Sequence, residues 1–132
     1  MDAPRPAARA RRPVYLNLPA IRMPVPAIAS ILHRISGALL FFVGVPVVLW
    51  GLQSSLASPE SYASFRAFIA QPLVKVAALV LVWAYLHHLF AGLRHLLQDV
   101  QVGLDLKPAR QSAIAAIVAA LFITVLVALR LW

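Results

Sequence analysis

The sequence contains no cysteine and few charged residues, and both absences narrow the possible chemistry. Without cysteine, the chain itself can form no disulfide and can ligate no iron–sulfur cluster. Charged residues make up 12% of the 132 residues, whereas a soluble domain carries about a quarter. Hydrophobic residues make up 62%, and the mean hydropathy is +0.85. Because a small soluble domain buries too little surface to hide so much apolar area, the composition predicts a protein of the lipid bilayer.

Three long apolar stretches are each able to cross a bilayer, which takes about 20 helical residues. We predict helices at about 26–53, 72–99 and 109–131. The second stretch contains three histidines, so it can span only if these side chains face protein rather than lipid. No run of short alternating strands is present, which argues against a barrel. The predicted fold is all-α, with a basic segment over residues 1–25 and one three-helix transmembrane domain over residues 26–132.

Prolines mark the expected helix boundaries. Pro26 and Pro72 suit first helical turns, where a missing backbone N–H costs little, and Pro108 directly precedes the third helix. Pro46 lies inside the first helix, two residues after Gly44, and predicts a kink there. The four prolines of residues 12–26 predict an extended approach to the membrane rather than a helix.

Lysine and arginine are distributed unevenly along this chain of net charge +8. Nine of the twelve lie before or at the start of the first helix or around the second connection, namely Arg5, Arg9, Arg11, Arg12, Arg22, Arg34, Arg94, Lys107 and Arg110. The other three, Arg66, Lys75 and Arg130, fall on the opposite side. Basic residues accumulate on the cytoplasmic side of a membrane. We therefore predict a multi-pass membrane protein with its amino terminus on the cytoplasmic side, its carboxyl terminus on the opposite side and no nucleic-acid partner.

The second helix carries the residues best suited to bind a cofactor. At about 100° per residue, His88, Gly92, His95 and Asp99 fall on one stripe of this helix. His88 can offer a neutral imidazole to a metal, Gly92 leaves room for a flat ring, and His95 lies about 10 Å along the axis. This pattern predicts a haem site with acidic groups pointing toward the cytoplasm. The alternative is that these histidines only hydrogen-bond between helices, and we assign such a structural role to His87.

The first helix opens with a second polar face. Ser30, His33, Arg34 and Gly37 follow the spacing i, i+3, i+4 and i+7, which places them together. Alone, Arg34 would be interpreted as a snorkelling residue at the membrane boundary. With Ser30 and His33 beside it, Arg34 can also bind a carbonyl-bearing ligand and an acidic group. Gly37 and Gly44 are interpreted as positions of close helix packing.

Two motifs carry a resemblance to a known family. The first comprises Arg12-Pro-Val-Tyr-Leu-Asn-Leu, Ile21-Arg-Met-Pro and Ser30-Ile-Leu-His-Arg-Ile-Ser-Gly37. The second is His88-Leu-Phe-Ala-Gly-Leu-Arg-His95 followed by Asp99. In these segments, and over nearly its whole length, the sequence closely resembles the cytochrome b membrane subunit of bacterial succinate dehydrogenase.

The resemblance implies a protein of the bacterial inner membrane with a periplasmic carboxyl terminus. It also implies a complex of a flavoprotein subunit, an iron–sulfur subunit and two three-helix anchors, of which the two anchors together form one haem-binding bundle. It implies that haem b lies between the anchors, with His88 as one axial iron ligand and the other ligand on the partner. His33, Arg34 and His95 then correspond to residues near the haem propionates. Ser30 and Arg34 correspond to ubiquinone-site residues, so that electrons from succinate oxidation reach quinone here. Succinate oxidation itself would belong to the flavoprotein, and this chain alone would carry no catalytic residue for it.

Three alternative functions remain open at this point. The anchor of a fumarate reductase has the same architecture and runs the reaction in the opposite direction, with menaquinone. A small transport protein could use the histidines as a proton path and would need no haem. A purely structural assembly subunit would tolerate replacement of His88 and Ser30.

Overall fold

The computed structural model describes residues 20–132, so the predictions for residues 1–19 lie outside it. The elements of the described part, in chain order, are the helices α1 (Val25–Leu39), the π-helical turn η2 (Leu40–Gly44), α2 (Val45–Ala57), α3 (Pro59–Ile69), α4 (Pro72–Asp99) and α5 (Leu106–Leu131). All of these elements are helical, which confirms the predicted all-α class for the described residues.

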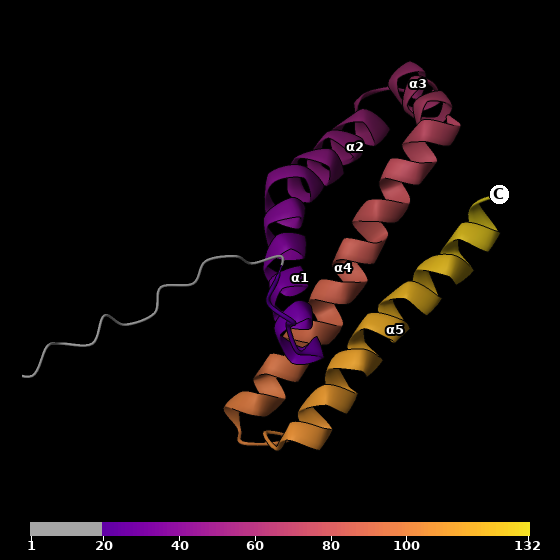
Figure 1. Ribbon diagram of the computed structural model, residues 1–132. Coiled ribbons are helices and arrows are strands. Elements are labelled where there is room, and N and C mark those ends of the chain that lie inside the picture. The colour runs from indigo at the N-terminus through magenta and orange to yellow at the C-terminus, as the bar shows by residue number, and fades with distance from the viewer. Residues whose placement is uncertain (1–19) are drawn as a thin grey trace, which may run out of the picture.

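Three helical stretches of residues 20–132 are long and apolar enough to cross a membrane: Val25–Ala57, Pro72–Asp99 and Leu106–Leu131. They run alternately up and down, with α4 between the α1–α2 stretch and α5 in Figure 1. The first stretch continues to Ala57, beyond the predicted end at residue 53, and α5 begins at Leu106 rather than near residue 109. At a rise of about 1.5 Å per residue, each stretch exceeds the roughly 30 Å of a hydrocarbon core.

The first span changes direction at η2, where the helix widens for one turn (Figure 1). The sequence predicted a kink at Pro46, and Pro46 lies in the first turn of α2, just after this π-helical turn. Proline has no backbone N–H to donate to the preceding turn, and a π-helical turn is a common way to absorb such a defect. The kink is therefore present and begins a few residues before the proline.

Small side chains allow the helices to approach closely where α1, α4 and α5 meet. Within residues 20–132 the buried hydrophobic residues are all alanines, namely Ala29, Ala84, Ala91, Ala109, Ala113, Ala116 and Ala120. Four of them follow one another along α5 at spacings of three or four residues, so they form a single stripe facing α4 and α1. In membranes such small-residue stripes permit dense packing between helix backbones.

The short helix α3 joins the first two spans at one end of the bundle. The hydroxyl of Ser58 accepts a hydrogen bond from the backbone N–H of Ser61 and caps the helix. A hydrogen bond from its own backbone N–H and one from Ser58 hold the pKa of Glu60 below its usual value. Trp50 of α2 packs edge-on against Phe65 and Phe68 of α3. This aromatic cluster fixes α3 against the first span.

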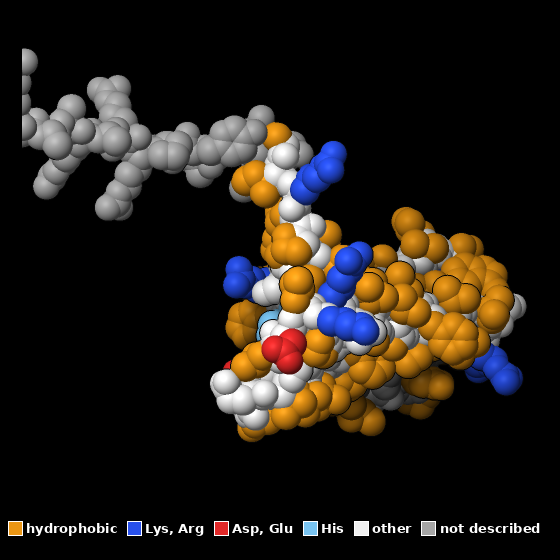
Figure 2. Space-filling view, turned by 60° about the horizontal axis from the view of Figure 1, so that its bottom comes forward, with side chains coloured by type: hydrophobic (Ala, Val, Ile, Leu, Met, Phe, Trp, Pro, Cys, Tyr) orange, Lys and Arg blue, Asp and Glu red, His pale blue; other side chains and the backbone are white. Residues whose placement is uncertain are grey.

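The opposite end of the bundle carries the connection between α4 and α5 and will be called the basic end. It is defined by the described basic residues Arg22, Arg34, Arg94, Lys107 and Arg110. The chain reverses here through two residues with positive φ, Gln101 and Gly103. Figure 2 looks onto this end, where lysine and arginine side chains stand out from a surface that is otherwise mainly hydrophobic.

Candidate functional site

Three histidine rings gather between α1 and α4, near the basic end. The ring of His33 on α1 stacks on that of His88 on α4, with centroids 4.1 Å apart and an interplanar angle of 9°. The ring of His33 also meets that of His95, at a centroid distance of 5.0 Å and a tilt of 54°. The structure thus brings together the two histidines of the predicted stripe on α4 and the histidine of the polar face on α1.

The hydrogen bonds around His88 determine which of its ring nitrogens is available for a ligand. Nδ1 lies 3.0 Å from the backbone carbonyl oxygen of His33 and 3.3 Å from Oγ of Ser36. A carbonyl oxygen can only accept, so Nδ1 must carry the proton and donate it. In a neutral imidazole this leaves the lone pair on Nε2. The same arrangement, with one nitrogen held by a carbonyl and the other free, is usual for histidines that bind metals.

Gly37 is part of this site rather than a plain packing position. A β-carbon at Gly37 would lie 2.7 Å from Cε1 of His88, so a larger residue would have to displace the imidazole. Gly92 was expected to clear space for a flat ring. In the structure its nearest side-chain neighbour is Nε2 of His33, 3.4 Å from where a β-carbon would stand. Both glycines therefore border the histidine cluster from opposite helices.

His87 is buried in the protein and stacks on a ring outside this cluster. It is 0% exposed and stacks on Trp83 with an interplanar angle of 10° and centroids 5.5 Å apart. The ring lies against the backbone of Ala29, but neither nitrogen makes a hydrogen bond of normal geometry to a described residue. His87 thus fills the interior between helices, while its sequence neighbour His88 lies beside Ser36 and Gly37.

Ser30 and Arg34 lie one turn apart on α1, as their spacing predicts. Arg34 is exposed and Ser30 is partly buried. Among the described residues neither side chain has a hydrogen-bond partner, so both are free to contact a ligand or a second protein. Asp99 is exposed at the last residue of α4, one turn beyond His95.

Two features of the site were not foreseen from the sequence. Ser36 is 1% exposed and connects His33 to His88, although it lies off the face formed by Ser30 and Arg34. Arg94, counted in the sequence among the basic residues around the second connection, is only 7% exposed. It donates from Nε to Oγ of Ser112 at 3.1 Å and from a terminal nitrogen to the Ala109 carbonyl at 3.4 Å. Arg94 therefore joins α4 to α5 inside the bundle.

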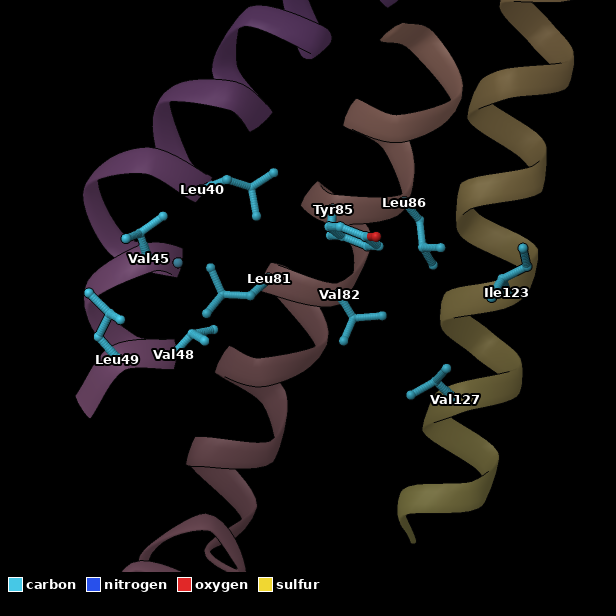
Figure 3. Close-up of a pocket in the computed structure, with 11 residues that line it drawn as sticks. Leu40, Val45, Val48, Leu49, Leu81, Val82, Tyr85, Leu86, Ile123 and Val127 are labelled. Atoms are coloured by element: carbon cyan, nitrogen blue, oxygen red, sulfur yellow. The ribbon is translucent and has the colours of Figure 1, made fainter. Parts of the chain in front are cut away.

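An apolar groove of about 550 Å³ begins one turn beyond the histidine cluster, on the side away from the basic end. Figure 3 shows Leu81 and Tyr85 of α4 lining it between side chains of α2 and of α5. Leu81 and Tyr85 precede His88 by seven and three residues and so share its side of α4. The groove is therefore continuous with the face on which His88 lies.

No group of three or more His, Cys, Asp or Glu side chains in residues 20–132 is arranged to hold a metal ion. A metal bound at His88 would need further ligands from outside these residues, such as the macrocycle that a haem brings.

Comparison with known proteins identifies the family. The model of the succinate dehydrogenase/fumarate reductase transmembrane subunit matches residues 8–128. The chain belongs to this family. It is 36% identical to the succinate dehydrogenase cytochrome b556 subunit of Coxiella burnetii, over 93% of this chain and 98% of that protein. Identity to the subunit of the same name from Paracoccus denitrificans is 34%, over 89% and 90% of the two chains.

The chain is also similar to a mitochondrial protein. The succinate dehydrogenase cytochrome b560 subunit of Bos taurus is 31% identical, over 81% of this chain and 64% of its own length. Family membership and the three membrane-spanning helices agree with the resemblance seen in the sequence.

Proposed function

We propose that this chain is the cytochrome b anchor subunit of a succinate:quinone oxidoreductase, which holds haem b together with a partner anchor and passes electrons to ubiquinone. One observation carries the proposal: Nδ1 of His88 is engaged by the His33 carbonyl at 3.0 Å, which leaves Nε2 free to bind iron. The names of the relatives, cytochrome b556 and b560 subunits, support the same cofactor.

The residues around His88 fit a haem on this chain's side. Ser36 and the His33 carbonyl orient the imidazole, and Gly37 gives it the space it occupies. When bound, the haem supplies a one-electron redox centre. His33, Arg34 and His95 stand toward the basic end of the site, where cationic or hydrogen-bonding groups would stabilise acidic propionates.

Ser30 and Arg34 are the residues we assign to quinone. A quinone carbonyl gains electron density as it is reduced, so a fixed guanidinium and a hydroxyl stabilise the reduced forms more than the oxidised one. The guanidinium of Arg34 presents a planar fork of donors. Both side chains are free of hydrogen bonds to the described residues and lie at the basic end, where a soluble electron donor would dock.

The partners follow from the same proposal. A second three-helix anchor would supply a further ligand to the iron and cover the apolar groove and the adjoining face of α4. An iron–sulfur subunit would bind at the basic end, taken as cytoplasmic, and a flavoprotein subunit would oxidise succinate. This chain would contribute no catalytic residue to succinate oxidation.

Reduced-minus-oxidised spectra of the purified complex test the haem assignment directly. We expect His88→Ala to remove or severely weaken the signal of a six-coordinate low-spin haem. His87→Ala is the matched control, because it removes a neighbouring imidazole that faces the protein interior, and it should leave the signal largely intact. His95→Ala should change the midpoint potential more than the haem content.

Four other results would favour the alternatives to this proposal. If only His87→Ala removes the signal, the iron ligand is His87 rather than His88. A complex that contains no haem at all would favour a transport role for the histidines. Normal haem content and turnover after both His88→Ala and Ser30→Ala would favour a purely structural subunit. A fumarate reductase anchor would show the same spectra and would differ in its preferred quinone.

A further inference from the structure

Ser36 is the buried polar residue with the most direct link to His88. Its hydroxyl donates to the backbone carbonyl of His33 at 2.9 Å, which fixes the direction of the O–H bond. The lone pairs of Oγ then face Nδ1 of His88 at 3.3 Å. Because the His33 carbonyl accepts from the same N–H at 3.0 Å, Nδ1–H is shared between two acceptors on one turn of α1.

We propose that Ser36, acting with the His33 carbonyl, is a positioning residue that sets the orientation and basicity of His88 and thereby the redox potential of the iron it binds. This inference rests on the proposed function, since it assumes that His88 is the axial ligand. It assigns a role to a residue that does not contact the haem or the quinone directly.

The direction of the effect follows from the chemistry of imidazole. Acceptors on Nδ1–H polarise the N–H bond, which leaves more electron density on the ring and makes Nε2 a stronger donor to a metal. A stronger donor stabilises ferric iron relative to ferrous iron and so lowers the midpoint potential. Losing one of the two acceptors should therefore raise the potential, while the His33 carbonyl, which no side-chain substitution removes, keeps the tautomer.

The geometry also explains why Ser36 has to be small and polar. It is 1% exposed between α1 and α4, and Gly37 next to it already places the backbone against the His88 ring. A serine in a helix can satisfy its own hydroxyl through the carbonyl three or four residues earlier. Here that local bond leaves the oxygen lone pairs directed across the helix interface toward His88.

Potentiometric titration of the haem in the whole purified complex, together with its electron paramagnetic resonance spectrum, tests the proposal. Ser36→Ala should retain haem and raise the midpoint potential. The shift should correspond to at most about a tenfold change in the ferrous-to-ferric ratio at fixed potential, or about 59 mV for a one-electron couple. The low-spin ferric spectrum should also change, because the imidazole is held less firmly. Ser36→Cys should shift the potential in the same direction, since sulfur is a weak acceptor.

Ser55→Ala is the matched control. Ser55 also donates to a carbonyl of its own helix, that of Gly51 at 2.7 Å, but α2 carries it away from the histidines. Ser55→Ala should leave the midpoint potential and the ferric spectrum of the haem at wild-type values. If Ser36 served only to pack α1 against α4, Ser36→Ala would lower thermal stability without moving the potential.

The outcomes separate this inference from the proposed function. Retention of haem in His88→Ala would overturn both. Loss of haem in His88→Ala, with wild-type potential and spectrum in Ser36→Ala, would overturn the role of Ser36 alone. Should Ser36→Ala fail to assemble, Ser36→Cys decides by the same criterion.

Discussion

Gly37 of α1 faces the imidazole of His88 on α4 so closely that a β-carbon there would lie 2.7 Å from Cε1. We therefore expect Gly37→Ala to push the ring out of its hydrogen bonds, at a cost of about 1–3 kcal/mol typical of overpacking. We would measure the haem content of the assembled complex and the intensity of its low-spin signal, and both should decrease.

Gly44 provides the control on the same helical stretch. A β-carbon there would meet only the side chain of Leu40, at 3.3 Å, and a leucine can shift by a small rotation. Gly44→Ala should therefore leave the haem spectrum unchanged. A wild-type haem spectrum in Gly37→Ala as well would show that Gly37 is not needed for the position of His88.

Replacing Ser30 or Arg34 should separate quinone reduction from succinate oxidation. Loss of one preorganised donor to a developing negative charge typically costs a hundredfold or more, about 3 kcal/mol. Ser30→Ala and Arg34→Leu should therefore slow succinate-driven quinone reduction strongly, while a soluble dye that takes electrons upstream is still reduced at a normal rate. Arg34→Lys should restore activity only in part, because an ammonium group lacks the planar fork.

Arg110→Leu is a suitable control for these variants, since it removes an exposed arginine at the same end of the bundle. Near wild-type quinone reduction in assembled Ser30→Ala and Arg34→Leu complexes would place the quinone site elsewhere. Arg34 would then be an anchor at the membrane boundary.

The buried pair of Arg94 and Ser112 should behave as one unit in stability measurements. Ser112→Ala leaves Nε of Arg94 without its acceptor at 3.1 Å, and an unsatisfied buried donor costs about 1–3 kcal/mol. In an Arg94→Met background no guanidinium remains to be stranded, so the same change should cost almost nothing. Unfolding of the purified complex by heat or detergent gives both differences, and equal costs in the two backgrounds would refute the coupling.

The orientation in the membrane can be tested with reporter fusions. The charge asymmetry predicts that a reporter active only in the periplasm works when fused after Trp132 and fails when fused after Val102, in the connection between α4 and α5. The reverse pattern would invert the assignment of the basic end to the cytoplasm.

The sequence predicts the three spans well because long apolar runs and prolines act locally. Pro26 and Pro72 lie in the first turns of α1 and α4, and Pro46 lies next to the change of direction in the first span. The sequence also predicts that His88 and His95 share one face of α4, since helical periodicity alone brings residues seven apart onto the same face.

What the sequence could not provide were contacts between helices. The role of Ser36 depends on the rotation of α1 relative to α4, and the stacking of His33 on His88 depends on how closely Gly37 lets the two helices approach. The burial of Arg94 follows from a hydroxyl eighteen residues later on α5. Hydrophobicity profiles favour a membrane boundary for an arginine, so only the tertiary structure reveals that it lies inside.

The widened turn η2 has a consequence for how this protein can vary. A π-helical turn adds one residue to the helix, so everything beyond Gly44 is rotated by about 100° relative to an uninterrupted α-helix. The polar face of α1 therefore ends at the turn, and α2 presents a different set of side chains to α3 and to the groove. We therefore expect substitutions within Val45–Ala57 to leave the orientation of Ser36 and Gly37 unchanged, so that the two halves of the first span accept substitutions independently.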